Sequence, residues 1–163
     1  MALMIEQPPH ISIVTGRCAK VDVLIVDDDR DIRAMFSAYL EHEGCTVRTA
    51  CDGGRAIDQA NLRPPDVIVM DMVMPRFDGW TALKRLKGAP STAHIPIIGL
   101  SGLPMAREQA RAVGFDAFLA KPCRLARLWR EIRALLDPAR LSCKTGVGPY
   151  SDPTPTLLRP PLD

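Results

Sequence analysis

Residues 21–50 read VDVLIVDDDRDIRAMFSAYLEHEGCTVRTA, and they decide the fold. The stretch starts with a short apolar run, Val21 to Val26, rich in valine and isoleucine. After Asp29 the pattern becomes amphipathic, and Gly44 supplies a stop signal for a helix. A second apolar run, Cys45 to Ala50, follows. Runs this short are typical of strands covered on both faces, so the stretch predicts a strand–helix–strand unit.

The same alternation continues as far as residue 137. Further apolar runs lie at Val67 to Met70, Ile95 to Leu100 and Ala117 to Ala120. Further helical patterns lie at Asp52 to Leu62, Gly79 to Lys87, Pro104 to Val113 and Leu125 to Leu136. The alternation of five strands and five helices predicts a doubly wound α/β fold, a parallel sheet with helices on both faces.

The composition is that of an ordinary globular protein of 163 residues, 47% hydrophobic and 25% charged. We expect an N-terminal extension (1–20), one α/β domain (21–137) and a proline-rich, disordered tail (138–163). A net charge of +2 gives no indication of direct nucleic-acid binding. The sequence shows no signal peptide or membrane-spanning run, so we expect a cytoplasmic protein that does not bind membranes. The five cysteines lack paired metal-ligand spacing, which favours free thiols.

Polar side chains follow four of the predicted strands. Asp27 and Asp28 follow the first, Asp71 the third, Ser101 the fourth and Lys121 the fifth. Ligands of doubly wound sheets bind beyond the carboxyl ends of the strands, so these residues share the edge where chemistry is expected. Clustered carboxylates repel one another unless a cation intervenes, and Mg²⁺ prefers such oxygen ligands. An aspartate beside Mg²⁺ can attack phosphorus, while a lysine and a hydroxyl can donate to the phosphoryl oxygens.

Each of these residues also has a simpler explanation. Asp29 fits a helix N-cap, and a single aspartate at a strand end usually forms a turn. Lys121, just before Pro122, fits a solvated loop. Acid, acid, hydroxyl and amine at one edge of one sheet are better explained together by a functional site than by four coincidences.

Five segments carry a resemblance to a known family. They are VLIVDD (23–28), VIVMDMVMP (67–75), DG (78–79), PIIGLSG (96–102) and FLAKP (118–122). Together they resemble the receiver domain of bacterial two-component response regulators, over about residues 21–137. The resemblance implies a flavodoxin-like fold, with five parallel strands in the order 2-1-3-4-5 and five helices.

The resemblance also implies a metal site and a phosphoacceptor. Asp71 matches the phosphoacceptor and is a ligand of Mg²⁺. Asp28 matches the residue that ligates Mg²⁺ directly, and Asp27 the neighbour that acts through a metal-bound water. The backbone carbonyl of Val73 would complete the protein ligands.

Four further positions match the machinery that holds the phosphoryl group and reports it. Ser101 matches the hydroxyl residue that bonds this group, and Gly102 the small residue that leaves room for it. Lys121 matches the ion-pairing lysine, and its bond to Pro122 is expected to be cis. Phe118 matches the aromatic switch position, with phenylalanine in place of tyrosine.

The implied function is that of a switch and not of an enzyme. A histidine kinase or a histidine phosphotransfer protein would supply the phosphoryl group. Ser101 would then move toward the phosphoryl oxygens and Phe118 would turn inward. The face formed by the fourth helix, fifth strand and fifth helix would change shape and bind a downstream protein or a second copy of the chain.

Two features depart from a simple receiver pattern or remain open. Val73 and Leu103 are apolar where fast-dephosphorylating relatives often carry polar side chains, which predicts slow self-hydrolysis. Four arginines, spaced three apart, lie on the last predicted helix: Arg124, Arg127, Arg130 and Arg133. They form either a solvated face or a docking or dimer surface, where acidic residues such as Asp116 would meet them.

The sequence leaves several possibilities for the output of the switch. We expect a stand-alone regulator, because the residues after 137 are too few and too proline-rich for a DNA-binding domain. The alternative is a receiver fragment of a hybrid kinase or a DNA-binding regulator. An aspartyl-phosphate phosphatase is disfavoured, because such enzymes need an acid where Val73 stands and usually a cap domain. A degenerate scaffold is disfavoured because Asp71 and Lys121 are both present.

Overall fold

A computed structural model describes residues 20–75, 78–102, 105 and 107–136. Five parallel strands form one sheet in the order β2-β1-β3-β4-β5. The strands are β1 (Asp22–Val26), β2 (Thr46–Ala50), β3 (Val67–Asp71), β4 (Ile97–Ser101) and β5 (Ala117–Ala120). The helices are α1 (Arg30–His42), α2 (Gly53–Leu62), α3 (Gly79–Gly88), α4 (Arg107–Ala112) and α5 (Leu125–Leu135). The predicted doubly wound fold and its strand order are confirmed.

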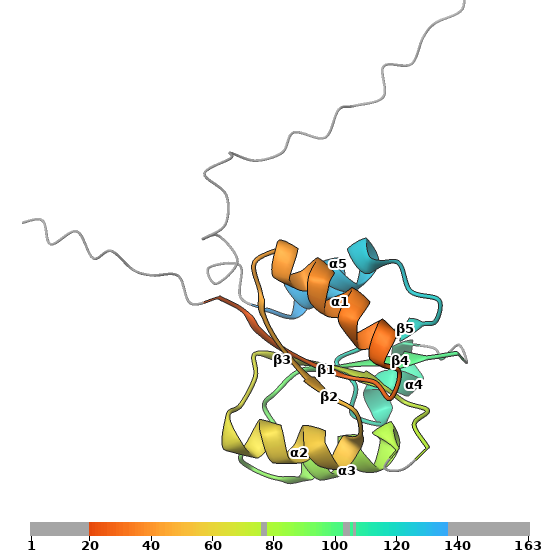
Figure 1. The fold of residues 1–163 in the computed structure, drawn as a ribbon. Helices are drawn as coiled ribbons and strands as arrows, with labels where there is room; N and C mark the ends of the chain where they lie inside the picture. The colour runs from red at the N-terminus through yellow and green to blue at the C-terminus, as the bar shows by residue number, and fades with distance from the viewer. Residues whose placement is uncertain (1–19, 76–77, 103–104, 106, 137–163) are drawn as a thin grey trace, which may run out of the picture.

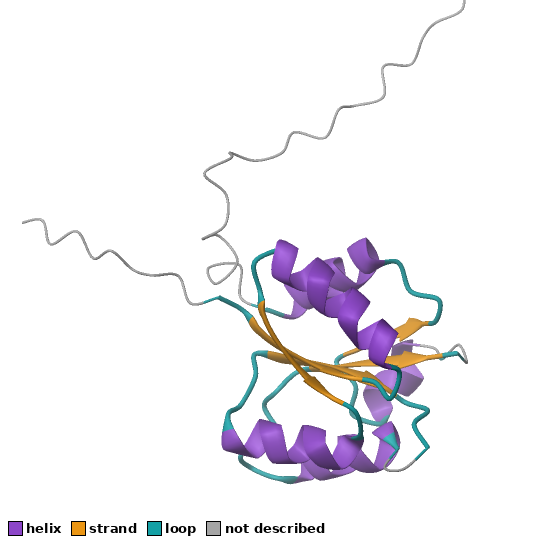
Figure 2. Ribbon diagram, in the orientation of Figure 1, coloured by secondary structure: helices purple, strands orange, loops and turns teal. Residues whose placement is uncertain are grey.

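The sheet forms the middle of three layers (Figure 1, Figure 2). Helices α1 and α5 cover one face, where Phe36, Leu40, Leu128 and Ile132 are buried. Helices α2, α3 and α4 cover the other face. All residues of β1, β3 and β4 are buried, whereas the edge strands β2 and β5 are partly exposed. Central strands covered on both faces explain the unbroken apolar runs in the sequence.

Three helices have an N-cap aspartate in the connection that follows a strand. Asp29 accepts hydrogen bonds from the backbone N–H groups of Asp31 and Ile32 at the start of α1. Asp52 and Asp78 cap α2 and α3 in the same way. The N-cap interpretation of Asp29 is therefore confirmed, and these caps fix the loops that border the candidate site.

Some boundaries differ from the predicted ones. The fourth helix is short: a turn around Gly114 (φ 107°), in which the Phe115 N–H donates to the Ala110 carbonyl, follows Ala112. Strand β2 begins after Cys45, because the Cys45 N–H donates to Leu40 at the end of α1. The predicted start of the fourth helix, Leu103, the tail and nearly all of the N-terminal extension lie outside the described residues. No helix among the described ranges has the length and apolar character needed to cross a membrane.

Candidate functional site

The carboxyl ends of β1 and β3 bring three aspartates together. Asp71 is the last residue of β3, and Asp27 and Asp28 directly follow β1. One carboxylate oxygen from each of the three lies within 4.8 Å of the others. Asp27 and Asp71 are buried, whereas Asp28 is exposed. Three acids at this spacing form the oxygen-only donor set that suits a hard divalent cation such as Mg²⁺.

Lys121 reaches this acidic cluster from the end of β5. Its backbone N–H donates to the Ser101 carbonyl at 2.7 Å, which continues the pairing of β4 with β5. Its Nζ lies 2.8 Å from Asp27 Oδ2 and 2.9 Å from Asp71 Oδ2. The expected cis peptide bond between Lys121 and Pro122 is confirmed. One ammonium therefore bridges two buried carboxylates that would otherwise repel each other.

Burial and pairing act against each other in this cluster. Burial raises the pKa of Asp27, although the hydrogen bonds from Lys121 and from the Asp29 backbone oppose the rise. Burial lowers the pKa of Lys121, but the hydrogen bonds to Asp27 and Asp71 outweigh it, so the pKa of Lys121 is raised. Lys121 therefore stays charged. Burial destabilises the ionised carboxylate of Asp27, and an added cation would reduce this free-energy cost.

The remaining oxygens of the three acids differ in their partners. Asp27 Oδ1 accepts the Asp29 N–H at 2.9 Å, and Asp71 Oδ1 accepts the Val73 N–H at 3.1 Å. Within the described part of the chain, no group donates to the Asp28 carboxylate. Asp28 is thus the acid with both oxygens left for a ligand.

Ser101 and Gly102 end β4 beside the acids. Ser101 is buried, and its strand neighbour Leu100 is paired with Asp71 in the sheet register. Gly102 is exposed, and a Cβ built on it would have no atom within 4 Å. This open space lies at the residue for which the sequence predicts phosphoryl access. The side chain of Val73, from the loop after β3, is 68% exposed.

Phe118 belongs to a row of three aromatic rings, two of which pack over Gly99 of β4. The ring of Phe118 packs edge-to-face on Phe115 at 5.6 Å, and Phe115 packs in the same way on Trp80 of α3 at 5.6 Å. A Cβ at Gly99 would lie 2.8 Å from Phe115 and 2.9 Å from Phe118. Glycine at this strand position therefore makes room for the predicted switch residue.

From the sequence, no role was assigned to two residues near the site, although Gly79 belongs to the DG segment (78–79) that carries part of the family resemblance. Arg33 of α1 donates from Nη1 to the carbonyl oxygens of Asp27 and Asp28. Gly79 begins α3 so close to Asp71 that a Cβ would collide with the Asp71 carbonyl oxygen. Their spacing gave a weak signal: Arg33 lies one helical turn after the acidic loop, and Gly79 follows the Asp78 cap.

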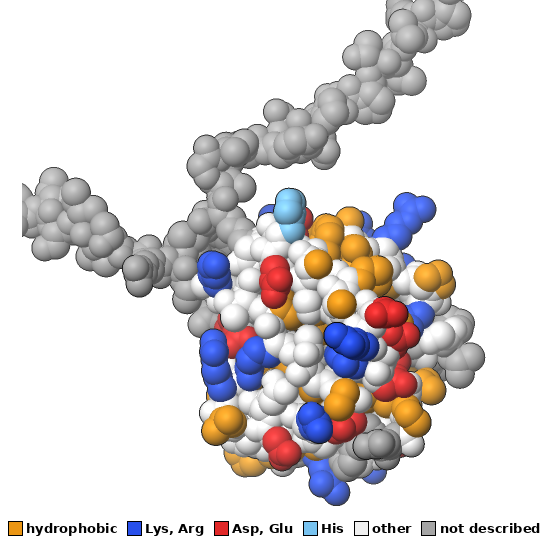
Figure 3. Space-filling view, in the orientation of Figure 1, with side chains coloured by type: hydrophobic (Ala, Val, Ile, Leu, Met, Phe, Trp, Pro, Cys, Tyr) orange, Lys and Arg blue, Asp and Glu red, His pale blue; other side chains and the backbone are white. Residues whose placement is uncertain are grey.

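The four arginines of the last helix, Arg124, Arg127, Arg130 and Arg133, are all exposed. Asp116, the acid that the sequence suggested as a partner across an interface, pairs with Lys87 at 2.8 Å and accepts the Ile97 N–H. On the face shown in Figure 3, basic and acidic side chains are interspersed without a large patch of one sign. The geometry is compatible with both interpretations of the four arginines, a solvated face and a docking or dimer surface.

The model of one protein family, described as the response regulator receiver domain, matches residues 23–133. The chain belongs to this family. Receiver domains are phosphoacceptors in two-component signalling and are signalling domains rather than conventional enzymes. The receiver assignment made from the five sequence segments is thereby confirmed.

Curated relatives and solved structures agree with the family. The DNA-binding dual master transcriptional regulator RpaA of Synechocystis sp. is 34% identical over 70% of this chain and 48% of its own length. The response regulator MprA of Mycobacterium tuberculosis is 36% identical over 71% of this chain and 50% of its own length. This receiver chain therefore spans about half the length of these relatives.

Two solved structures place the receiver fold beside known examples. The chemotaxis protein CheY4 of Vibrio cholerae has a TM-score of 0.67 at 32% identity, covering 72% of this chain and 100% of that chain. The receiver domain of the sensor histidine kinase PA1611 of Pseudomonas aeruginosa has a TM-score of 0.65 at 29% identity, covering 72% of this chain and 98% of that chain. In that structure a magnesium ion is coordinated in the active-site cleft. Receiver domains bind Mg²⁺ in such an acidic site, and the aspartate cluster of this chain has the matching donor set.

Proposed function

We propose that Asp71 is the phosphoacceptor of this receiver domain and that Mg²⁺ binds among Asp27, Asp28 and Asp71. The observation that carries the proposal is the bridging of Asp27 and Asp71 by Lys121, beside the Asp28 carboxylate, which accepts no hydrogen bond from the residues that the structure describes. The backbone carbonyl of Val73 is the proposed fourth protein ligand. The metal would neutralise charge on the acids and on the incoming phosphoryl group.

The phosphoryl donor is a phosphohistidine of a histidine kinase or a histidine phosphotransfer protein. A carboxylate oxygen of Asp71 attacks phosphorus, the phosphorus–nitrogen bond breaks, and the histidine leaves with the bonding electron pair. Lys121, already next to Asp71, donates to the new phosphoryl oxygens together with Ser101. Gly102 leaves space for the group.

The readout is a change on the face formed by α4, β5 and α5. Ser101 moves toward the phosphoryl group, and Phe118 turns into the space that this movement opens. Phe118 is half-buried, and its ring packs on Phe115. A downstream protein, or a second copy of the chain, binds the altered face. The DNA binding named for the cyanobacterial relative is a property of that protein.

Asp71→Asn is expected to abolish phosphorylation, because an amide cannot act as the nucleophile. The measurement is incubation with acetyl phosphate and Mg²⁺, followed by intact-mass spectrometry for the added phosphoryl group. Asp58→Asn, an exposed aspartate on α2, is the matched control and should be labelled like the wild type. The assignment is wrong if the wild type gains no phosphoryl group or if Asp71→Asn is labelled equally.

The aspartyl phosphate is expected to hydrolyse slowly, because the Val73 side chain cannot orient an attacking water. Val73→Asn should shorten its lifetime about tenfold or more by supplying a polar group beside Asp71. Loss of the phosphoryl group is followed after removal of acetyl phosphate. Val113→Asn, an exposed valine next to α4, is the control. A wild-type lifetime of only seconds would contradict the prediction.

A further inference from the structure

The side chain of Arg33 forms hydrogen bonds with the loop that carries Asp27 and Asp28. Arg33 lies in α1, and its Nη1 donates to the Asp27 carbonyl at 2.6 Å and to the Asp28 carbonyl at 3.0 Å. The side chain is half-buried, and its bond to the Asp27 carbonyl is partly shielded from water, whereas its bond to the Asp28 carbonyl is exposed. Hydrogen bonds from a charged donor are stronger than neutral ones. The helix that follows the acidic loop therefore holds the loop backbone through one cation.

The two acids of this loop depend on Arg33 to different degrees. The Asp27 carboxylate is already fixed by Lys121 and by the Asp29 N–H. The Asp28 carboxylate has no donor among the residues that the structure describes, so only its backbone fixes where it lies. Arg33 supplies the side-chain contact to that backbone. Loss of Arg33 would thus leave Asp28 as the acid with the least fixed position.

We propose that Arg33 is a positioning residue for the divalent cation, acting through the backbone of Asp27 and Asp28. The inference rests on the proposed Mg²⁺ site. A ligand held in place before binding loses less conformational freedom when the metal arrives. Contacts that orient metal ligands are typically worth about 10–100-fold in metal affinity.

The positive charge of Arg33 and its hydrogen bonds to the loop have opposite effects on the affinity for Mg²⁺. An experiment can therefore separate them. A guanidinium near the site repels Mg²⁺, so removing the charge alone would tighten binding. Removing the hydrogen bonds to the loop backbone would weaken Mg²⁺ binding. Arg30, in the first turn of the same helix, is exposed and makes no contact with the loop carbonyls within the described ranges. Substitution of Arg30 therefore tests the loss of a nearby positive charge without the loss of the hydrogen bonds to the loop.

The experiment measures Mg²⁺ dissociation constants by isothermal titration calorimetry on the whole chain. Arg33→Met keeps much of the length of the side chain and removes both charge and donors; we expect binding about tenfold or more weaker. Arg30→Met should bind unchanged or slightly tighter. Arg33→Lys keeps the charge on a shorter side chain that cannot reach both carbonyls, and its affinity should be intermediate. The Mg²⁺ concentration that half-saturates labelling by acetyl phosphate should rise in parallel for Arg33→Met and stay near that of the wild type for Arg30→Met.

The outcomes separate this inference from the proposed function. A wild type that binds no Mg²⁺ contradicts the proposed metal site itself. A wild type that binds, with Arg33→Met binding equally or more tightly, overturns the role of Arg33 alone. A purely structural role would lower the melting temperature of the metal-free protein without changing the dissociation constant, and it would also overturn the proposal. If Arg33→Met does not fold, Arg33→Lys decides: affinity equal to that of the wild type overturns the proposal, and weaker binding supports it.

Discussion

Lys121→Met is expected to lower the free energy of unfolding by about 3 kcal/mol in metal-free buffer. Lys121 bridges Asp27 and Asp71, whose side chains are only 1% and 9% exposed. Methionine fills a similar volume but leaves the two carboxylates buried without a cation. Removal of one partner from a buried pair typically costs about 3–5 kcal/mol, and the 24% exposure of Lys121 favours the lower end. Urea unfolding in the presence of a chelator measures the change.

The pH dependence of this loss follows from the pKa shifts. The pKa of Lys121 is raised, so its contribution is present below the ordinary lysine pKa and is lost as pH rises through the folded-state value. The pKa of Asp27 is raised by burial, so the folded protein binds more protons than the unfolded chain just above the ordinary aspartate pKa. Without Lys121 this rise becomes larger. The deficit of Lys121→Met should therefore shrink as the pH falls from neutrality toward the ordinary aspartate pKa.

Magnesium gives a second check on the same variant. With the ammonium gone, the cation that bridges Asp27 and Asp71 no longer competes with Mg²⁺ for these carboxylates, so added Mg²⁺ should stabilise Lys121→Met more than the wild type. Lys84→Met, an exposed lysine on α3, is the control and should stay within about 0.5 kcal/mol of the wild type. If Lys121→Met were as stable as the wild type in chelator, the lysine would not offset the burial of the acids.

The sequence predicted the sheet and its acidic edge for a topological reason. Strands buried on both faces leave apolar runs that are short and easy to recognise, and β1 and β3 have this character throughout. In a parallel sheet the carboxyl ends of all strands lie at one edge, so residues far apart in sequence are brought together without any knowledge of side chains. Lys121 and Asp27, separated by 94 positions, illustrate this.

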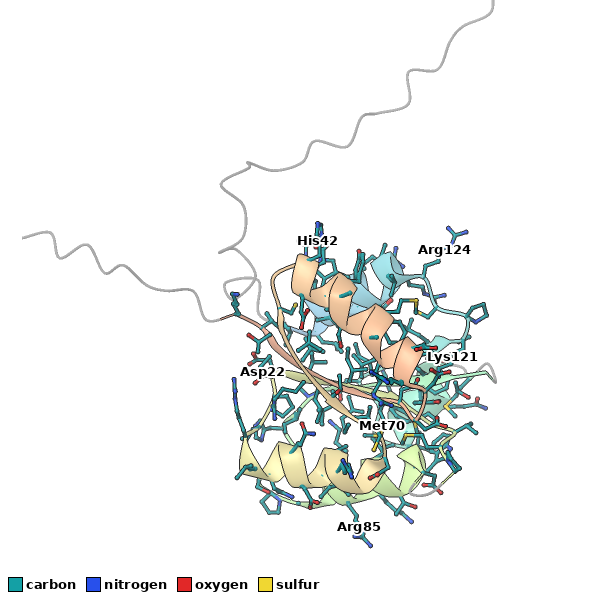
Figure 4. All side chains as sticks on the ribbon, in the orientation of Figure 1. Asp22, His42, Met70, Arg85, Lys121 and Arg124 are labelled. Atoms are coloured by element: carbon teal, nitrogen blue, oxygen red, sulfur yellow. The ribbon has the colours of Figure 1, made fainter. Side chains whose placement is uncertain are left out.

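Contacts that depend on how side chains reach across elements could not be predicted in this way. Arg33 donates to carbonyl groups that precede its own helix. The side-chain conformation that this requires cannot be recognised from sequence periodicity. Asp22 lies at the opposite end of the sheet from Lys121 (Figure 4). It is paired with Arg48 at 3.1 Å and with Arg63 at 3.0 Å. Asp22 stands inside an apolar run, where a burial pattern alone gives no indication of its two partners.

Gly79→Ala is expected to lower the free energy of unfolding by about 3 kcal/mol and to slow phosphorylation of Asp71. Gly79 is buried at the start of α3, where the helix approaches the end of β3. A Cβ would collide with the carbonyl oxygen of Asp71 and lie 2.9 Å from the Cα of Met72. Both atoms belong to the backbone of the strand that ends in the proposed phosphoacceptor. They cannot turn aside as a flexible side chain would, so α3 or Asp71 must move.

Gly88→Ala, at the other end of α3, separates this collision from a general effect of alanine in the helix. A Cβ at Gly88 meets no atom within 4 Å, so alanine there should leave stability unchanged or raise it slightly. Urea unfolding and labelling by acetyl phosphate are measured on both variants. A stable Gly79→Ala protein with normal labelling would mean that α3 can withdraw from β3 at little cost. In that case the close approach at Gly79 would not be what sets the position of Asp71.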